Sequence, residues 1–169
     1  MKRRMALIGL FAYVSAPSVL RARQYAKDYG GPWQLEQLII EQGWARMTPG
    51  ATKTGAIYLT IYNDGETEDV LQSVTSSAAS AVGIHRTVVE GGIAKMVPLP
   101  DGLRLPIQTD VSMRPGSTHV MLVGLNRSFA PGGTFPVQLS FRNAGLFAID
   151  VPIHPLGVTP AVDHSSHDG

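Results

Sequence analysis

Residues 134–153 read TFPVQLSFRNAGLFAIDVPI. Apolar residues occupy every second position from Phe135 to Phe141, and again from Phe147 to Ile153. Successive side chains of a β-strand point to opposite faces, so this alternation is typical of a strand with one buried face. The intervening Asn143-Ala144-Gly145 has the composition of a turn. This stretch therefore predicts two strands joined by a tight turn.

The same pattern recurs along most of the chain. In Gly55–Tyr62, for example, Ile57, Leu59 and Ile61 share one face. We predict strands near residues 36–45, 55–62, 68–74, 81–88, 93–97, 107–113, 117–123, 134–142 and 145–153. Turn sequences rich in Gly, Pro, Asn and Asp separate them, and no run beyond the N-terminal segment has helical periodicity. Many short strands with turns between them indicate an all-β antiparallel sandwich or barrel.

The amino-acid composition excludes several classes of function. The 169 residues suit one domain with short extensions. Only 16% are charged, against roughly 25% in a typical soluble domain. A formal net charge of +1 without a long basic run argues against a nucleic-acid partner. The chain has no cysteine, which excludes disulfides, thiolate metal sites, iron–sulfur clusters and thiol catalysis.

The N-terminus resembles a secretory signal. Met1-Lys2-Arg3-Arg4 precedes the apolar run Met5–Val14, which is too short to span a bilayer. A buried amphipathic helix and a retained anchor are the alternatives. Cleavage after Ala16 would remove three basic residues and change the net charge from +1 to −2, and cleavage after Ala22 would give −3. We divide the chain into a signal peptide (1–22), a linker (23–34), a β-sandwich (35–156) and a disordered tail (157–169).

Metal-binding chemistry is suggested by His119-Val120-Met121. Residues two apart on a strand share a face, so His119 and Met121 project together while Val120 faces the core. Neutral imidazole and thioether ligands favour copper, Cu(I) especially, over magnesium, calcium or manganese. Taken alone, the tripeptide fits a surface histidine beside a packing methionine better than it fits a metal site.

Two further residues extend this pattern. His85 and Met96 each end a predicted strand, and the spacing is H-x10-M-x22-H-x-M. Two imidazoles and two thioethers would suit a trigonal or tetrahedral Cu(I) site. The alternatives are an exposed polar role for His85 and an edge-packing role for Met96. Met47 and Met113 lie outside the pattern, and we expect Met113 to pack.

With these residues the sequence resembles the periplasmic copper-chaperone family PCuAC (the DUF461 domain). Its signature is close to H-x10-M-x21-H-x-M, one residue shorter than here in the middle interval. That interval contains the turn Pro100-Asp101-Gly102, where an insertion costs little. The similarity runs from about Leu38 to Ile153 and is carried by Gly43–Gly50, Ala56–Asn63, Met113–Leu125 and Phe141–Gly145.

The resemblance implies a cupredoxin-like Greek-key β-sandwich that binds Cu(I) through His85, Met96, His119 and Met121. It also implies a periplasmic carrier that delivers copper towards the copper centre of cytochrome c oxidase. Oxidase subunit II or a Sco-type protein would accept the metal. We expect a monomer with no stable membrane insertion after signal cleavage. The alternative is a metal-free structural or adhesive β-sandwich of the cell envelope.

An enzyme is not expected, because the chain has neither a G-x-S-x-G nor an H-E-x-x-H motif. A blue-copper electron carrier is disfavoured because that site needs a cysteine. Thioethers form no disulfides, which suits a carrier in an oxidising compartment, although they are open to oxidation to the sulfoxide.

The tail adds His164 and His167, with His154 upstream. These histidines predict either an auxiliary Cu(II) site or a merely solvated tail.

Overall fold

The computed structural model describes residues 30–157. The predicted signal peptide, most of the predicted linker, and the tail with His164 and His167 lie outside the described residues. Eleven strands make up the described chain. They are β1 (Trp33–Leu35), β2 (Leu38–Arg46), β3 (Thr54–Asn63), β4 (Asp69–Thr75), β5 (Ala79–Glu90), β6 (Ile93–Pro98), β7 (Leu103–Leu105), β8 (Thr109–Met113), β9 (Thr118–Leu125), β10 (Thr134–Phe141) and β11 (Leu146–His154).

The all-β prediction is confirmed, and each of the nine predicted strands has a counterpart. Two short strands were not predicted. Strand β1 starts inside the segment taken as linker, and β7 follows the Pro100-Asp101-Gly102 turn. Three residues are too few to show an alternating pattern, so only the pairing of β1 with β2 and of β7 with β4 identifies them.

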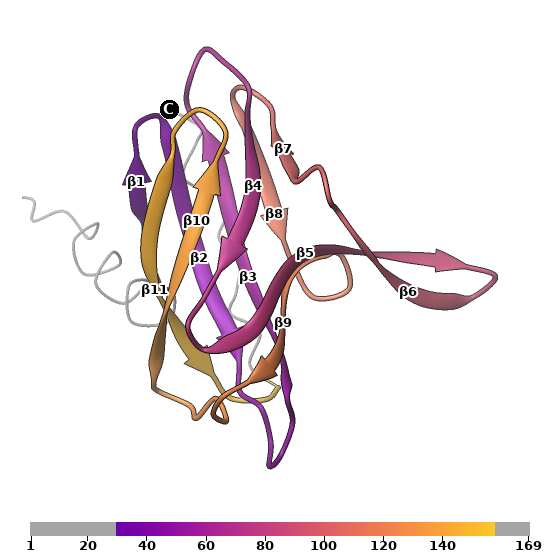
Figure 1. The fold of residues 1–169 in the computed structure, drawn as a ribbon. Helices are drawn as coiled ribbons and strands as arrows, with labels where there is room; N and C mark the ends of the chain where they lie inside the picture. Colours follow the sequence, from indigo (N-terminus) through magenta and orange to yellow (C-terminus); the bar gives the residue numbers. More distant parts are fainter. Residues whose placement is uncertain (1–29, 158–169) are drawn as a thin grey trace, which may run out of the picture.

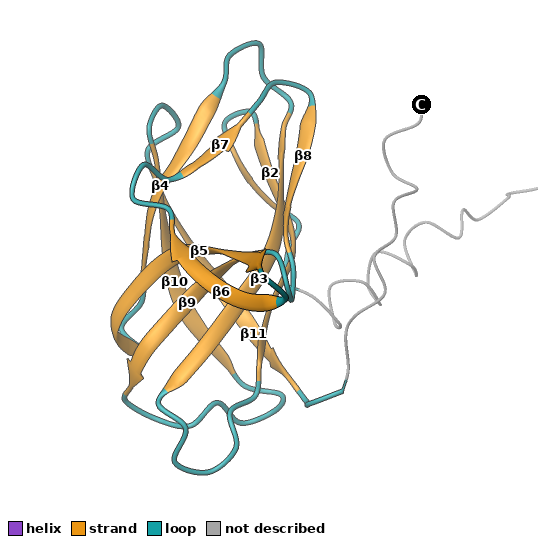
Figure 2. Cartoon of the chain, turned by 90° about the vertical axis from the view of Figure 1, so that its right-hand side faces the viewer, coloured by secondary structure: helices purple, strands orange, loops and turns teal. Residues whose placement is uncertain are grey.

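The strands form a sandwich closed around one core (Figures 1 and 2). Their order is β6-β5-β9-β3-β2-β11-β10-β4-β7, with β1 on β2 and β8 on β3. Neighbours such as β5/β9 and β4/β10 are not consecutive in sequence, which is the connectivity of Greek-key sandwiches. Pairing is antiparallel except between β2 and β11, which run parallel at Ala45/Ile153 and Arg46/His154.

Both halves of the sandwich supply the core. Strands β10 and β11 bury the alternate residues predicted for them, including Phe135, Leu139 and Val151 at 1% exposure or less. From the other half, Val120 and Leu122 are fully buried. Because inner and outer residues alternate, the inward position of Val120 and Leu122 turns His119 and Met121 to the outer face of β9.

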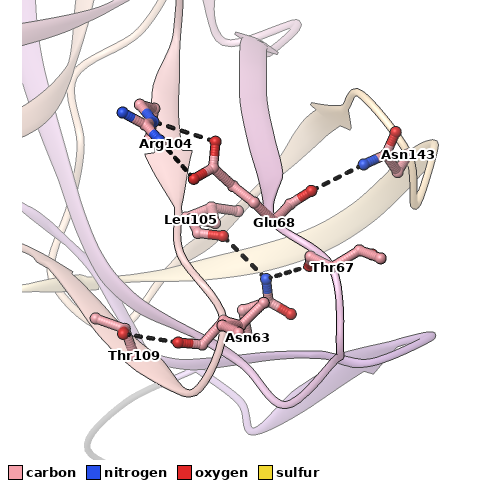
Figure 3. A network of polar contacts seen from close by, with 8 residues as sticks. Asn63, Thr67, Glu68, Arg104, Leu105, Thr109 and Asn143 are labelled. Carbon is pink, nitrogen blue, oxygen red and sulfur yellow. Dashed lines mark hydrogen bonds and ion pairs between the residues drawn. The ribbon is translucent and has the colours of Figure 1, made fainter.

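One end of the sandwich is held by polar contacts (Figure 3). The buried Asn63 amide donates to the carbonyl oxygens of Thr67 and Leu105, each at 2.9 Å. Arg104 forms a two-pronged ion pair with Glu68, and the Asn143 amide donates to the Glu68 carbonyl oxygen. The three bridges tie β3, β4, β7 and the β10–β11 turn together at this end.

The distal part of the β5–β6 hairpin contrasts with this end, because it projects away from the sandwich (Figure 1). It turns through Gly91 and Gly92, both at positive φ, where glycine carries no steric penalty. All six residues of β6 are exposed. We call residues 88–97 the arm.

Candidate metal centre

Strand register brings His85, Met96, His119 and Met121 to one face. His85 on β5 lies directly opposite His119 on β9, and Met121 lies opposite Gly83. Met96 on β6 lies opposite Thr87, two residues along β5 from His85 and therefore on the same face. Directly opposed residues have Cβ atoms about 4.5–5.5 Å apart. The four side chains thus occupy neighbouring positions on three adjacent strands.

The two imidazoles lie side by side across the β5–β9 pair. Their centroids are 6.3 Å apart and their planes differ by 25°. Metal–imidazole bonds are about 2 Å long, and a ring centroid lies about 1 Å behind its nitrogen, so two rings on one ion have centroids at most about 6 Å apart. The observed separation is slightly larger than this limit, so the two rings would have to move closer together to bind one ion.

Both histidines make the same backbone contact. The Nδ1 of His85 lies 3.3 Å from the Gly83 carbonyl oxygen, and the Nδ1 of His119 lies 3.1 Å from that of Ser117. A carbonyl oxygen only accepts, so each Nδ1 carries the proton and donates it. In the neutral ring this leaves the Nε2 lone pair free for a metal. Such contacts fix the tautomer and orientation of metal-binding histidines.

Glycine at position 83 leaves room for the site. A Cβ added there would lie 3.1 Å from Cε1 of His85, tighter than an ordinary van der Waals contact. Gly83 also faces Met121 across the strand pair. A larger residue would push against the His85 ring. Sequence analysis did not single out this glycine, which lies two residues before His85 on β5 and opposite Met121 on β9.

An aromatic pair that was not predicted as part of the site begins next to His119. Tyr58 lies 6.4 Å from His119 between ring centroids, and Trp44 lies 4.6 Å from Tyr58. Trp44 and Tyr58 are directly opposed on β2 and β3 and form a small buried cluster apart from the core. The aromatic residues extend the row of His85 and His119 across the outer face. Trp44 and Tyr58 form an apolar border on one side of the proposed site.

Burial raises the pKa of the Tyr58 hydroxyl above its ordinary value of 10.0, and the charge of Arg46 opposes this rise in part. The folded protein therefore keeps the proton to a higher pH than the unfolded chain does. Stability from this group is complete below pH 10 and is lost as the pH rises through the folded pKa.

We therefore expect the free energy of unfolding to fall when the pH rises above about 10, the ordinary pKa of tyrosine, and to fall less in Tyr58→Phe. Urea unfolding at a series of alkaline pH values checks this. Tyr62→Phe, a tyrosine on the same strand, is the matched control. An alkaline loss of stability that is the same in Tyr58→Phe and the wild type would contradict the prediction.

The other histidine and methionines of residues 30–157 lie apart from the site. Met113 is 2% exposed and belongs to the core, as predicted. Met47 packs against the core from its edge. His154 lies 6.0 Å from Trp44, so Trp44 and Tyr58 stand between it and His119.

Within residues 30–157, no group of three or more His, Cys, Asp or Glu side chains is placed to hold a metal ion. The candidate centre has two imidazoles, and its other donors are thioethers. Such a donor set matches the soft, monovalent Cu(I) better than a hard divalent cation. The described residues contain no helix that is long and apolar enough to cross a membrane.

The chain is similar to known proteins in sequence and in fold. The family described as "Putative lipoprotein LpqE-like" matches residues 38–153. "Putative lipoprotein Lxx21020" of Leifsonia xyli subsp. xyli (strain CTCB07) is 28% identical over 120 residues, 71% of each chain.

Two solved structures share the fold. The copper-bound PCuAC domain from PmoF2 has a TM-score of 0.62 at 24% identity, covering 73% of this chain and 97% of that one. The solution structure of the CuI form of DR1885 from Deinococcus radiodurans has a TM-score of 0.56 at 21% identity, covering 79% and 85%. The sandwich is thus the fold of PCuAC domains, and the match over residues 38–153 shows that the chain belongs to the LpqE-like lipoprotein family.

Proposed function

We propose that the protein is an exported copper chaperone that binds one Cu(I) ion through His85, Met96, His119 and Met121. The observation that carries this proposal is the register of β5, β6 and β9, which sets two imidazoles and two thioethers on one face. The backbone contacts that leave each Nε2 free support it. So do the structural neighbours, two of which are described as copper-bound and CuI forms.

The donor set explains how such a carrier would hold and release its cargo. Thioethers do not titrate, so copper binding to them displaces no proton, and only the two imidazoles must be neutral. The site lies on the outer face of the sheet, where a second protein can offer its own ligands. As a carrier, the protein would pass Cu(I) on by ligand exchange without catalysing a reaction. A copper-accepting protein such as cytochrome c oxidase subunit II or a Sco-type protein would receive the metal in the periplasm.

Export is supported by the family description as a lipoprotein and by the basic and apolar N-terminal sequence. None of the 169 residues is a cysteine, so this sequence offers no thiol for a sulfur-linked lipid. We propose a periplasmic carrier with no stable membrane insertion after signal cleavage.

Anaerobic competition against a chromophoric Cu(I) chelator tests the function. We expect the chain to withdraw one equivalent of Cu(I), and X-ray absorption to show two nitrogen and two sulfur ligands. A chain ending at Leu156 is the matched control. It should keep this site while losing any Cu(II) bound by His164 and His167. If the chelator keeps all its copper, the chaperone assignment is wrong and the metal-free sandwich remains.

A further inference from the structure

The four proposed ligands differ in how firmly the fold holds them. His119 is 7% exposed, and its strand β9 is paired with β3 on one side and β5 on the other. His85 and Met121 are half-buried and lie within the β5–β9 ladder. Met96 is 60% exposed and belongs to β6, which ends the strand order of the sheet. Three ligands therefore sit on the sandwich, and one sits on the arm.

The contacts of the arm explain why it is the less constrained part. The pairing of β5 with β9 ends at Arg86/Thr118, and a hydrogen bond from Thr87 N to the Ser117 carbonyl oxygen follows it. Within the described chain, the hydrogen bonds and the ion pair of residues 88–97 stay inside the hairpin, including Lys95–Glu90 at 2.7 Å. None of these residues belongs to the buried core. A two-stranded hairpin without other support is marginally stable, and segments with few buried contacts open most readily.

The two faces of the arm carry different kinds of side chain. Val89, Ala94 and Met96 share the face of His85, and it carries no charged side chain along the arm. Glu90 and Lys95 lie on the opposite face, where they pair with each other. Among residues 30–157, no ion pair holds the ligand-bearing face of the arm against the sandwich. Met96 can therefore approach or leave the other three ligands without breaking a charged contact.

We propose that Met96 is the exchange ligand of the copper site. His85, His119 and Met121 form a fixed three-coordinate site. The arm brings the Met96 thioether to Cu(I) as the fourth ligand. When the arm swings out, the copper–sulfur bond to Met96 breaks and an incoming ligand takes that position. The copper stays Cu(I) throughout, and no proton moves at the thioether. This assignment rests on the proposed function and adds to it the order in which the ligands leave.

Isosteric substitutions separate the two thioethers. Met96→Leu should weaken Cu(I) binding by about tenfold or less, because the fourth bond is offset by the cost of ordering the arm. Met121→Leu should weaken it by about a hundredfold, because a fixed ligand is lost. Met47→Leu, which removes a thioether outside the site, should leave the affinity unchanged. Equal losses in Met96→Leu and Met121→Leu would overturn the assignment.

The rate of release gives a second readout. Copper-loaded protein is mixed anaerobically with increasing bathocuproine disulfonate. In the wild type the rate should level off at high chelator, because opening of the arm becomes limiting. In Met96→Leu it should keep rising in proportion to the chelator, since the entry position is already open. Proportional behaviour in both proteins would contradict the gating role.

Hydrogen exchange tests the arm directly, without copper transfer. Loading with Cu(I) should slow amide exchange in residues 88–96 of the wild type but not of Met96→Leu. Residues 119–122 of β9 should be protected in both. An arm that is equally protected with and without copper would refute its closure. If the wild type takes no Cu(I) from the chelator, the proposed function itself fails. If it binds Cu(I) but the two methionine variants behave alike, only the assignment of Met96 fails.

Discussion

Cu(I) binding should be almost abolished in the double variant His119→Ala, Met121→Ala. The two substitutions remove half of the proposed donors and leave only His85, on β5, and the exposed Met96, on the arm. Two ligands on separate strands do not define a trigonal or tetrahedral site. We expect the affinity to fall by about a thousandfold or more, which corresponds to about 4 kcal/mol. Anaerobic chelator competition measures it.

The control for this variant removes the same two functional groups elsewhere. Met47→Leu with His154→Gln deletes one thioether and one imidazole that are not among the four proposed ligands; Met47 packs against the core, and His154 lies against Trp44. Its Cu(I) affinity should equal that of the wild type. Circular dichroism should show both double variants folded, because Val120 and Leu122 still fill the core side of β9. Copper binding that survives the loss of His119 and Met121 would place the site elsewhere.

The largest loss of stability is expected for Phe129→Ala. Phe129 lies in the loop after β9 with no exposed surface, and its ring stacks on Phe135 with centroids 4.3 Å apart. Its backbone N–H donates a hydrogen bond to the Thr48 hydroxyl oxygen at 2.9 Å. Truncating a buried phenylalanine to alanine costs about 3–5 kcal/mol, through lost burial and the cavity left behind. Urea unfolding at neutral pH measures this loss.

Phe129→Leu should cost clearly less, because leucine refills much of the cavity. At a temperature where they remain folded, both variants should bind Cu(I) as the wild type does. Phe129 packs in the core of the sandwich, whereas the proposed ligands lie on the outer face of the sheet. A loss below about 1 kcal/mol in Phe129→Ala would show that the loop repacks around the cavity.

The alternation of apolar and polar residues predicted which face of each strand is buried, but it did not predict which strands lie next to each other in the sheet. His119 and Met121 could be assigned to one face because the two-residue repeat is a local property of extended backbone. The opposition of His85 to His119 could not be derived this way, because β5 and β9 are neighbours in the sheet although β6, β7 and β8 separate them along the chain. For the same reason, the sequence did not predict the pairing of Trp44 with Tyr58. Both lie on the outer face, and only their direct opposition on β2 and β3 makes them a buried pair.

The sequence alone established an all-β chain without thiols and the two imidazoles and two thioethers that it offers to a metal. These follow from composition and from the local stereochemistry of strands. Only the tertiary structure decided that β5, β6 and β9 lie together, that each Nδ1 points at a backbone carbonyl, and that Met96 stands on a projecting arm. Those features depend on which distant segments pack against one another, which is settled by burying a shared core rather than by any local pattern.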